Sequence, residues 1–117
     1  MPFIMSKVNV PVDAEQEIKL KSRLGKAMKL LPGLSEKYLL VGFESNHHFF
    51  LRGDNKEAIA YIEVSIFGNE NHLGCEDFGR AVTEIFFEVL HIPPQNIYLK
   101  FNDIAAWSVG GIFFDRR

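Results

Sequence analysis

The sequence has very little cysteine: Cys75 is the only one in 117 residues. A single cysteine excludes an intrachain disulfide, a Cys-x-x-Cys redox pair and a thiolate-rich metal site. We therefore expect no thiol–disulfide activity, and we expect any chemistry to come from nitrogen and oxygen groups.

An excess of positive charge is also missing. The chain has 13 lysine and arginine residues against 15 aspartate and glutamate residues, a formal net charge of −2. Charges scattered in this way form no basic stripe that could neutralise phosphates, so we expect no nucleic-acid partner. No apolar run approaches the roughly 20 residues of a membrane span, and no signal peptide or glycosylation sequon is recognisable. We expect no membrane partner and a cytoplasmic location. Release of the protein from the cell without a signal peptide stays an open alternative.

Apolar residues, by contrast, are abundant. They make up 47% of the chain, and phenylalanine alone occurs 11 times. A chain of 117 residues predicts one domain, residues 1–117, with a core of ordinary size. Because the apolar residues exceed what one such core needs, we expect part of them to cover an interface.

The order of periodic segments predicts two copies of one strand–helix–strand unit. Residues 1–11 predict a strand that Pro11 ends, Asp13 could cap a helix after it, and residues 58–67 predict the strand before a second helix. The two helices carry apolar residues at identical spacing: Leu20, Leu24, Ala27, Met28 and Leu31 in the first, and Phe78, Val82, Ile85, Phe86 and Val89 in the second. Prolines end both helices, and a Tyr-Leu pair, Tyr38-Leu39 or Tyr98-Leu99, lies in each of the strands predicted at residues 38–43 and 96–101. Residues 49–51 are a candidate for a further short edge strand.

This duplication, with pseudo-repeats at about residues 1–57 and 58–117, predicts an α+β fold of order β-α-β-β-α-β. Since crossover connections are right-handed, the strands of each unit are parallel, and both helices cover one face of a four-stranded sheet. The opposite face stays open, although the strands around Leu40, Ile62 and Val64 are apolar on both sides. We expect other copies of the chain to cover that face, and the apolar tail at residues 104–114 to pair with a neighbouring subunit.

The amino end holds the main candidate for catalysis. Pro2 follows the initiator methionine, which is removed before small residues, so we expect a chain that begins with the secondary amine of Pro2. An amine in an apolar pocket has a lowered pKa, and a neutral amine near pH 7 can act as a general base or nucleophile. The alternative is that Pro2 only stiffens the end of an edge strand, where its missing N–H costs nothing.

Short motifs along the whole chain carry a resemblance to a known family. They are Met1-Pro2-Phe3-Ile4, Asn9-Val10-Pro11, Tyr38, Ser65-Ile66-Phe67-Gly68, Ile97-Tyr98 and Trp107-Ser108-Val109-Gly110. Together they resemble the tautomerase superfamily, in the branch of macrophage migration inhibitory factor and D-dopachrome tautomerase. The resemblance implies a homotrimer with a pocket at each subunit boundary and no cofactor. It also implies a keto–enol tautomerase, which moves a proton between oxygen and carbon of an enolisable carbonyl acid of the phenylpyruvate or dopachrome type.

The resemblance also implies roles for particular residues. Pro2 matches the catalytic general acid/base, and the implied substrate-binding residues are Leu34, Tyr38, Ile66, Phe67, Tyr98, Lys100 and Val109. Tyr98 would come from the adjacent subunit, Ile66 or Phe67 would bind substrate at a strand end, and Val109 would form an apolar wall.

Two positions depart from the family's pattern. The human cytokine-like members have a lysine that contacts the substrate carboxylate where this chain has Leu34, and an asparagine where it has Lys100. We hypothesise that Lys100, on the same strand face as Tyr98, supplies the missing positive charge. Lys37 is the second candidate, and the alternative for Lys100 is an exposed edge lysine that discourages aggregation.

A protein of another class remains open: a cytokine-like trimeric interaction protein whose pocket is vestigial, because Leu34 replaces the expected lysine. A relative acting on an unsaturated dicarboxylate or a halogenated acrylate would need more pocket cations than the sequence places.

His47 and His48 would point to opposite faces of a strand and so make no metal pair. Gly110-Gly111 lacks the strand-to-helix context of a phosphate loop, and Trp107 is expected in the core or an interface.

Overall fold

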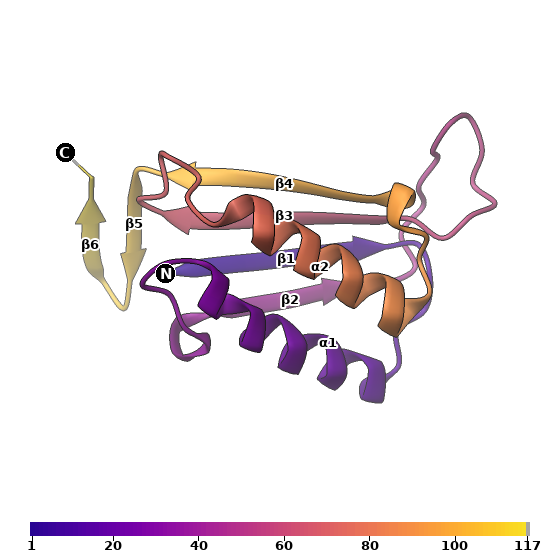
Figure 1. Ribbon diagram of the computed structural model, residues 1–117, viewed down its shortest axis with the longest axis horizontal. Coiled ribbons are helices and arrows are strands. Elements are labelled where there is room, and N and C mark those ends of the chain that lie inside the picture. The colour runs from indigo at the N-terminus through magenta and orange to yellow at the C-terminus, as the bar shows by residue number, and fades with distance from the viewer. Residues whose placement is uncertain (117) are drawn as a thin grey trace.

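Four strands form the main sheet of the protein, which the computed structural model describes over residues 1–116. They are β1 (Pro2–Val8), β2 (Leu40–Glu44), β3 (Ala60–Phe67) and β4 (Ile97–Ile104), in the spatial order β2-β1-β3-β4. β1 runs parallel to β2 and β3 parallel to β4, whereas β1 and β3 are antiparallel. Two helices, α1 (Ala14–Ala27) and α2 (Cys75–Leu90), pack side by side on one face of this sheet (Figure 1). The predicted α+β fold, with both helices on one face, is confirmed.

The helices form where the sequence predicts them. Asp13 caps α1, because its Oδ1 accepts the backbone N–H of Gln16 at 2.7 Å while the Gln16 side chain accepts the N–H of Asp13 at 3.0 Å. The apolar stripes bury Leu20, Leu24, Met28, Phe78, Val82 and Phe86 completely against the sheet. Each such side chain stabilises the fold by about 1.5–3 kcal/mol. Within residues 1–116, neither helix is long and apolar enough to span a bilayer.

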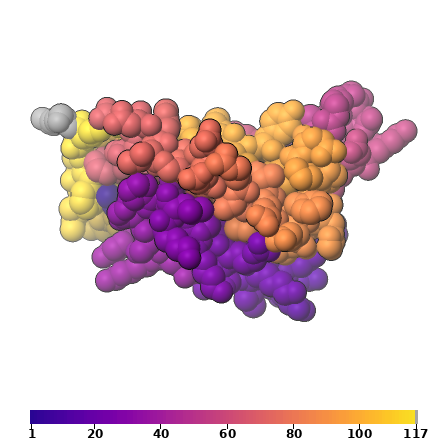
Figure 2. Space-filling model, in the orientation of Figure 1, coloured from indigo at the N-terminus to yellow at the C-terminus, as the bar shows by residue number. Residues whose placement is uncertain are grey.

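Two strand predictions are wrong. Tyr38 lies in a 3-10 turn, Glu36–Tyr38, and β2 begins only at Leu40. This strand is at the edge of the sheet, where Leu40 is 63% exposed, so the predicted buried strand at residues 38–43 is an exposed edge strand in the single chain. Residues 49–51 form no strand; an isolated bridge joins Leu51 to Asp54 in a long loop that projects from one end of the molecule (Figure 2).

The face of the sheet opposite the helices is mixed in character. The expectation of strands apolar on both sides holds only in part, because Ile62 and Val64 lie two residues apart and both face the helices. The other face carries Phe3, Met5, Lys7, Leu40, Glu44, Tyr61, Glu63, Tyr98 and Lys100. The covering of this face by other copies of the chain stays a prediction.

A two-stranded hairpin follows β4 and stands at the end of the sheet where the chain begins (Figure 1). Its strands, β5 (Ala106–Val109) and β6 (Ile112–Asp115), pair antiparallel with each other and form a sheet of their own. The turn between them is Gly110-Gly111, with φ values of 60° and 82°, as a two-residue type I′ turn requires. The predicted pairing of this tail with a neighbouring subunit stays a prediction.

Candidate active site

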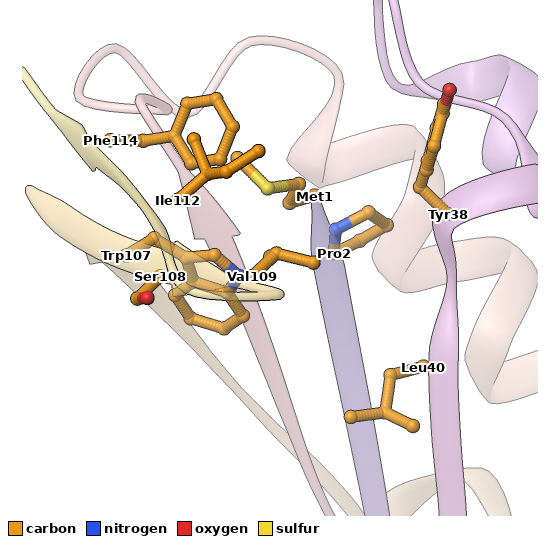
Figure 3. A pocket seen from close by; sticks show the side chains of 9 residues that line it. All are labelled: Met1, Pro2, Tyr38, Leu40, Trp107, Ser108, Val109, Ile112 and Phe114. Atoms are coloured by element: carbon orange, nitrogen blue, oxygen red, sulfur yellow. The ribbon is translucent and has the colours of Figure 1, made fainter.

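A pocket of about 630 Å³ lies between the hairpin and the start of β1 (Figure 3). Met1 and Pro2 lie in its middle, with Tyr38 and Leu40 on one side and the hairpin on the other. The hairpin contributes Trp107, Ser108, Val109, Ile112 and Phe114. The lining is therefore mostly apolar, as in pockets that hold organic ligands. The hydroxyls of Tyr38 and Ser108 point away from Pro2, which leaves the indole N–H of Trp107 as the polar side-chain group near it (Figure 3).

The hairpin lines the pocket with one face of its ladder. Trp107 pairs with Phe114 and Val109 with Ile112, and directly paired residues project to the same face. These four side chains point towards the amino end of the chain (Figure 3). Phe67, at the end of β3, contacts this wall, because its ring packs edge-on to Phe114 with centroids 6.1 Å apart.

The main sheet holds the amino end in this position. Pro2 pairs with Ile66 in the ladder between β1 and β3, and the N–H of Phe67 donates to the carbonyl of Met1 at 3.4 Å. Pro2 is buried, whereas Met1 is half-buried and lines the pocket. Burial lowers the pKa of the terminal amine on Met1 below its ordinary value, because desolvation disfavours the charged form. The fold thus places a partly desolvated amine at the pocket.

Tyr38 borders the pocket from the 3-10 turn, and that turn is anchored on α1. Lys21 Nζ lies 3.6 Å from Glu36 Oε2, and the Glu36 carboxyl packs onto Gly25, where a Cβ atom would come within 2.3 Å of it. Lys37 Nζ lies 5.4 Å from the centre of the Tyr38 ring, a cation–π geometry. Lys37, the second candidate for a carboxylate-binding cation, is therefore beside a lining residue.

The structure brings some of the predicted site residues together and separates others. Pro2, Tyr38 and Val109 line the pocket. Ile66 is 3% exposed and points into the core, so its contribution to this end of the sheet is its pairing with Pro2. Leu34 is partly buried against the core and does not line the pocket.

Tyr98 and Lys100 lie far from Pro2 within one chain. Tyr98 pairs with Tyr61, whereas Pro2 pairs with Ile66, five residues further along β3. At roughly 3.3 Å per residue, Tyr98 and Pro2 are therefore about 17 Å apart along the strand direction. Lys100 Nζ lies 3.5 Å from Glu63 Oε2. A hydrogen bond to Tyr61 and the charges of Tyr61 and Glu63 raise the pKa of Lys100. Both residues could approach a Pro2 from another copy of the chain, so their site roles stay predictions.

Several lining residues were missed from the sequence. Leu40, Ser108, Ile112 and Phe114 were not predicted, and Trp107 was expected in the core or an interface, whereas the structure places it in the pocket wall. The available signal was alternation: apolar residues at positions 107, 109, 112 and 114 flank a Gly-Gly dipeptide, a pattern typical of a hairpin with a two-residue turn.

The described residues offer few charged groups for ligand binding. Among residues 1–116, no lysine or arginine lines the pocket, and no group of three or more His, Cys, Asp or Glu side chains comes together as a metal site. The arrangement instead offers an amine, the indole N–H of Trp107 and aromatic walls. Such a site can transfer a proton to or from an apolar organic ligand.

Comparison with known proteins places this geometry in a family. The family model for macrophage migration inhibitory factor (MIF) matches residues 1–113. The chain belongs to the MIF family. This membership confirms the resemblance seen in the sequence, and at a coarse level it supports a tautomerase-like or MIF-like function.

Solved structures of MIF homologues share the fold. MIF2 from Leishmania major is 19% identical, with a TM-score of 0.90 and 97% of each chain covered. A MIF homologue from Prochlorococcus marinus is 24% identical, with a TM-score of 0.84 over 96% of this chain and 98% of that one. The protein Pt0534, in a form inactivated by 2-oxo-3-pentynoate, is 15% identical, with a TM-score of 0.81 and 93% of each chain covered. No curated protein sequence matches the chain.

Proposed function

We propose that this MIF-family protein is a keto–enol tautomerase whose general acid/base is the amine of Pro2, once Met1 has been removed. The observation that carries the proposal is the position of Pro2, which is buried at the amino end of β1 and lines an apolar pocket. Proton transfer next to a carbonyl needs a neutral base close to the substrate, and a desolvated amine is such a base. The aromatic walls favour an aryl carbonyl acid such as phenylpyruvate.

Removal of Met1 would change the pocket in two ways. The Met1 side chain lies close to the hairpin wall, so its loss enlarges the chamber (Figure 3). The terminal amine also moves from half-buried Met1 to buried Pro2. Burial lowers the pKa of the Met1 amine, and we expect desolvation to act in the same direction on an amine at Pro2. A lowered pKa would keep the secondary amine of Pro2 neutral over more of the range near pH 7.

The reaction needs only proton transfers. In the direction from ketone to enol, the Pro2 nitrogen takes a proton from the carbon next to the carbonyl group. The electron pair of that bond forms a carbon–carbon double bond, and the carbonyl oxygen becomes an enolate that takes up a proton. The indole N–H of Trp107, on the face of the hairpin that points towards the amino end, is a lining donor that can stabilise the charge on this oxygen. The reverse steps return the proton to carbon.

We also propose that the working form is a homotrimer in which Tyr98 and Lys100 of one copy approach Pro2 of the next. The distance between Pro2 and Tyr98 within one chain supports this, as does the position of Tyr98 and Lys100 on the face that the helices leave uncovered. Lys37, beside Tyr38, is the alternative source of positive charge. Of the variants Lys100→Ala and Lys37→Ala, the one that weakens carboxylate binding identifies the cation.

A related fold supports the substrate class. Pt0534 is described as inactivated by 2-oxo-3-pentynoate, and that compound is a 2-oxo acid. Phenylpyruvate is a 2-oxo acid as well, and its benzyl group matches the apolar lining formed by Trp107, Val109 and Phe114.

The test compares wild type with Pro2→Gly, after mass spectrometry has verified that Met1 is absent from both. The rate of phenylpyruvate tautomerisation, followed by the absorbance of the enol, should fall by about 10²- to 10⁴-fold in the variant. Pro11→Gly, which changes an exposed proline beyond the end of β1, is the matched control and should retain the rate.

Equal rates at the buffer level in wild type and Pro2→Gly would reject the enzyme. They would favour the cytokine-like trimeric interaction protein with a vestigial pocket. The observation that keeps this second function open is the lack of a lining lysine or arginine among residues 1–116.

A further inference from the structure

We infer that Arg116 is a positioning residue for the pocket, because its ion pair with Asp103 holds the β5–β6 hairpin, and with it Trp107, against the end of the main sheet. The role that this gives Arg116 in substrate binding rests on the proposed function.

Arg116 directly follows β6 and folds back onto the end of β4. Its Nη1 atom donates to both carboxylate oxygens of Asp103, at 2.6 Å for Oδ1, and its Nε atom lies 3.8 Å from Glu70 Oε2. The backbone N–H of Arg116 donates to the carbonyl of Ala105 at 2.8 Å. Arg116, after β6, is thereby bonded to Ala105, before β5, and its side chain is bonded to Asp103 near the end of β4.

Asp103 is itself held by the loop after β3. Its Oδ1 atom accepts the N–H of Asn69 at 2.7 Å, and the N–H of Gly68 donates to the carbonyl of Ile104 at 3.0 Å. The Asp103 side chain is 20% exposed and that of Arg116 31%, so water screens the pair only in part. Hydrogen bonding from Arg116 lowers the pKa of Asp103, which keeps the carboxylate charged at neutral pH.

This ion pair lies at the same level of the sheet as Pro2. Asp103 and Pro2 both pair with Ile66, from β4 and β1 respectively, so their backbones are about 10 Å apart, two strand spacings. Among the described residues of one chain, the hairpin strands pair only with each other. Within the chain, side-chain contacts therefore join the hairpin to the main sheet, and they include the edge-on packing of Phe67 against Phe114.

The wall that Arg116 positions is the one that the aryl group of a substrate would contact. Trp107 and Phe114 are paired across the hairpin and line the pocket, whereas Pro2 is held separately by β3. Release of the hairpin would widen the pocket and leave the surroundings of the Pro2 nitrogen in place. Loss of Arg116 should therefore weaken ground-state and transition-state binding alike, which raises KM and leaves kcat nearly unchanged.

The test uses Trp107, the only tryptophan, as its reporter. In Arg116→Gln, quenching of Trp107 fluorescence by acrylamide should increase without any ligand present. The KM for phenylpyruvate, and its Kd measured through Trp107, should rise about two- to fivefold, the range of a partly exposed ion pair. Arg116→Lys keeps the charge but loses the forked geometry, so it should fall between wild type and Arg116→Gln.

The matched control is Arg23→Gln. Arg23 forms an ion pair of the same kind, with Nη2 2.6 Å from Glu88 Oε1, but that pair joins the two helices away from the pocket. It should leave the quenching of Trp107 and the KM unchanged. In wild type, about 1 M sodium chloride, where the Debye length is roughly 3 Å, should move both quantities towards the values of Arg116→Gln.

Unchanged quenching of Trp107 in Arg116→Gln, or an equal change in Arg23→Gln, would overturn the inference. The fluorescence measurement needs no turnover, so it separates this inference from the proposed function. Increased quenching in Arg116→Gln together with an inactive wild type would reject the tautomerase and retain the positioning of the hairpin.

Discussion

Pro2 and Tyr98 lie at opposite ends of the main sheet of one chain, at levels about 17 Å apart along the strands. The proposed site needs both residues, and a tyrosine side chain cannot cover this distance. Under the proposed function, a pocket with both residues would therefore have to combine two copies of the chain.

Mixed assemblies test this requirement directly. Pro2→Gly and Tyr98→Ala should each lose activity when assembled alone. Chains of both kinds that are dissociated, mixed and reassembled should recover about a quarter of the wild-type rate, because random assembly pairs an intact Pro2 with an intact Tyr98 at that frequency. Individually impaired variants that stay inactive after verified mixing would contradict a site shared between subunits.

The rate should depend on pH as expected for a desolvated amine. Burial lowers the pKa of the Met1 amine, we expect the same direction for the Pro2 amine once Met1 is removed, and the neutral form is the base. In the direction from ketone to enol, kcat/KM should therefore rise with pH and level off below about pH 8, the ordinary pKa of a terminal amine. A titration of Pro2 followed by nitrogen NMR should give the same midpoint. A midpoint at or above the ordinary value would show that the amine is solvated.

An electrophilic 2-oxo acid should label the amino end. In 2-oxo-3-pentynoate, the compound that inactivates Pt0534, the triple bond is conjugated with the ketone. Addition of the Pro2 nitrogen would form a nitrogen–carbon bond while the proton of the amine moves to the neighbouring carbon. Peptide mapping should find one added ligand per chain, on the peptide that begins with Pro2, and phenylpyruvate should protect against it. Labelling of Cys75 or a lysine in place of Pro2 would contradict the proposed reactivity.

The turn of the hairpin should be sensitive to substitution. Gly111 has a φ of 82°, where a β-branched residue costs about 1–2 kcal/mol. Gly111→Val should therefore lower the free energy of unfolding and increase the exposure of Trp107. Gly53→Val is the control, since Gly53 has a φ of 88° in the projecting loop, distant from the pocket. Gly53→Val should lower the free energy of unfolding by a similar amount and leave the exposure of Trp107 unchanged. An equal change in the exposure of Trp107 in both variants would show that the strain does not act through the hairpin.

Ser6 offers a route to a more stable protein. Its hydroxyl is in the core, 1% exposed, and has no hydrogen-bond partner among the described residues. An unpartnered buried polar group is costly, so Ser6→Ala should raise the free energy of unfolding by about 1 kcal/mol. Ser65→Ala is the comparison, because the hydroxyl of Ser65 accepts a hydrogen bond from Asn102 at 3.2 Å. In denaturant unfolding, the free energy of unfolding should be higher than wild type for Ser6→Ala and lower for Ser65→Ala.

Features set by local periodicity could be predicted from the sequence. The apolar stripes of α1 and α2 and the cap at Asp13 require only residues close in the chain, and the crossover rule then makes the strands of each unit parallel. The prediction for residues 38–43 was wrong because a continuous apolar run is typical both of a buried strand and of an edge strand that is exposed in the single chain. The burial of Ile66 beside Pro2 depends on strand register, where a shift of one residue moves every side chain to the other face.

The pocket itself could be predicted only in part. Pro2, Tyr38 and Val109 were identified because each matches a residue of the family's motifs. Trp107, Ile112 and Phe114 line the pocket because the hairpin turns back at its glycines and Arg116 holds it to Asp103. That ion pair joins a chain end to the end of a strand, and no spacing in the sequence reveals it.

Met1 lines the pocket, and Arg116, which directly follows β6, holds the opposite wall, so the pocket lies between segments from both halves of the chain (Figure 1). An affinity handle fused upstream would leave Pro2 inside an ordinary amide, with no basic lone pair on its nitrogen. An affinity handle fused downstream would follow β6 directly and could displace the hairpin that lines the pocket. The informative reagent is thus an upstream fusion that a protease can trim back to Pro2, because turnover should begin only when the cut is made.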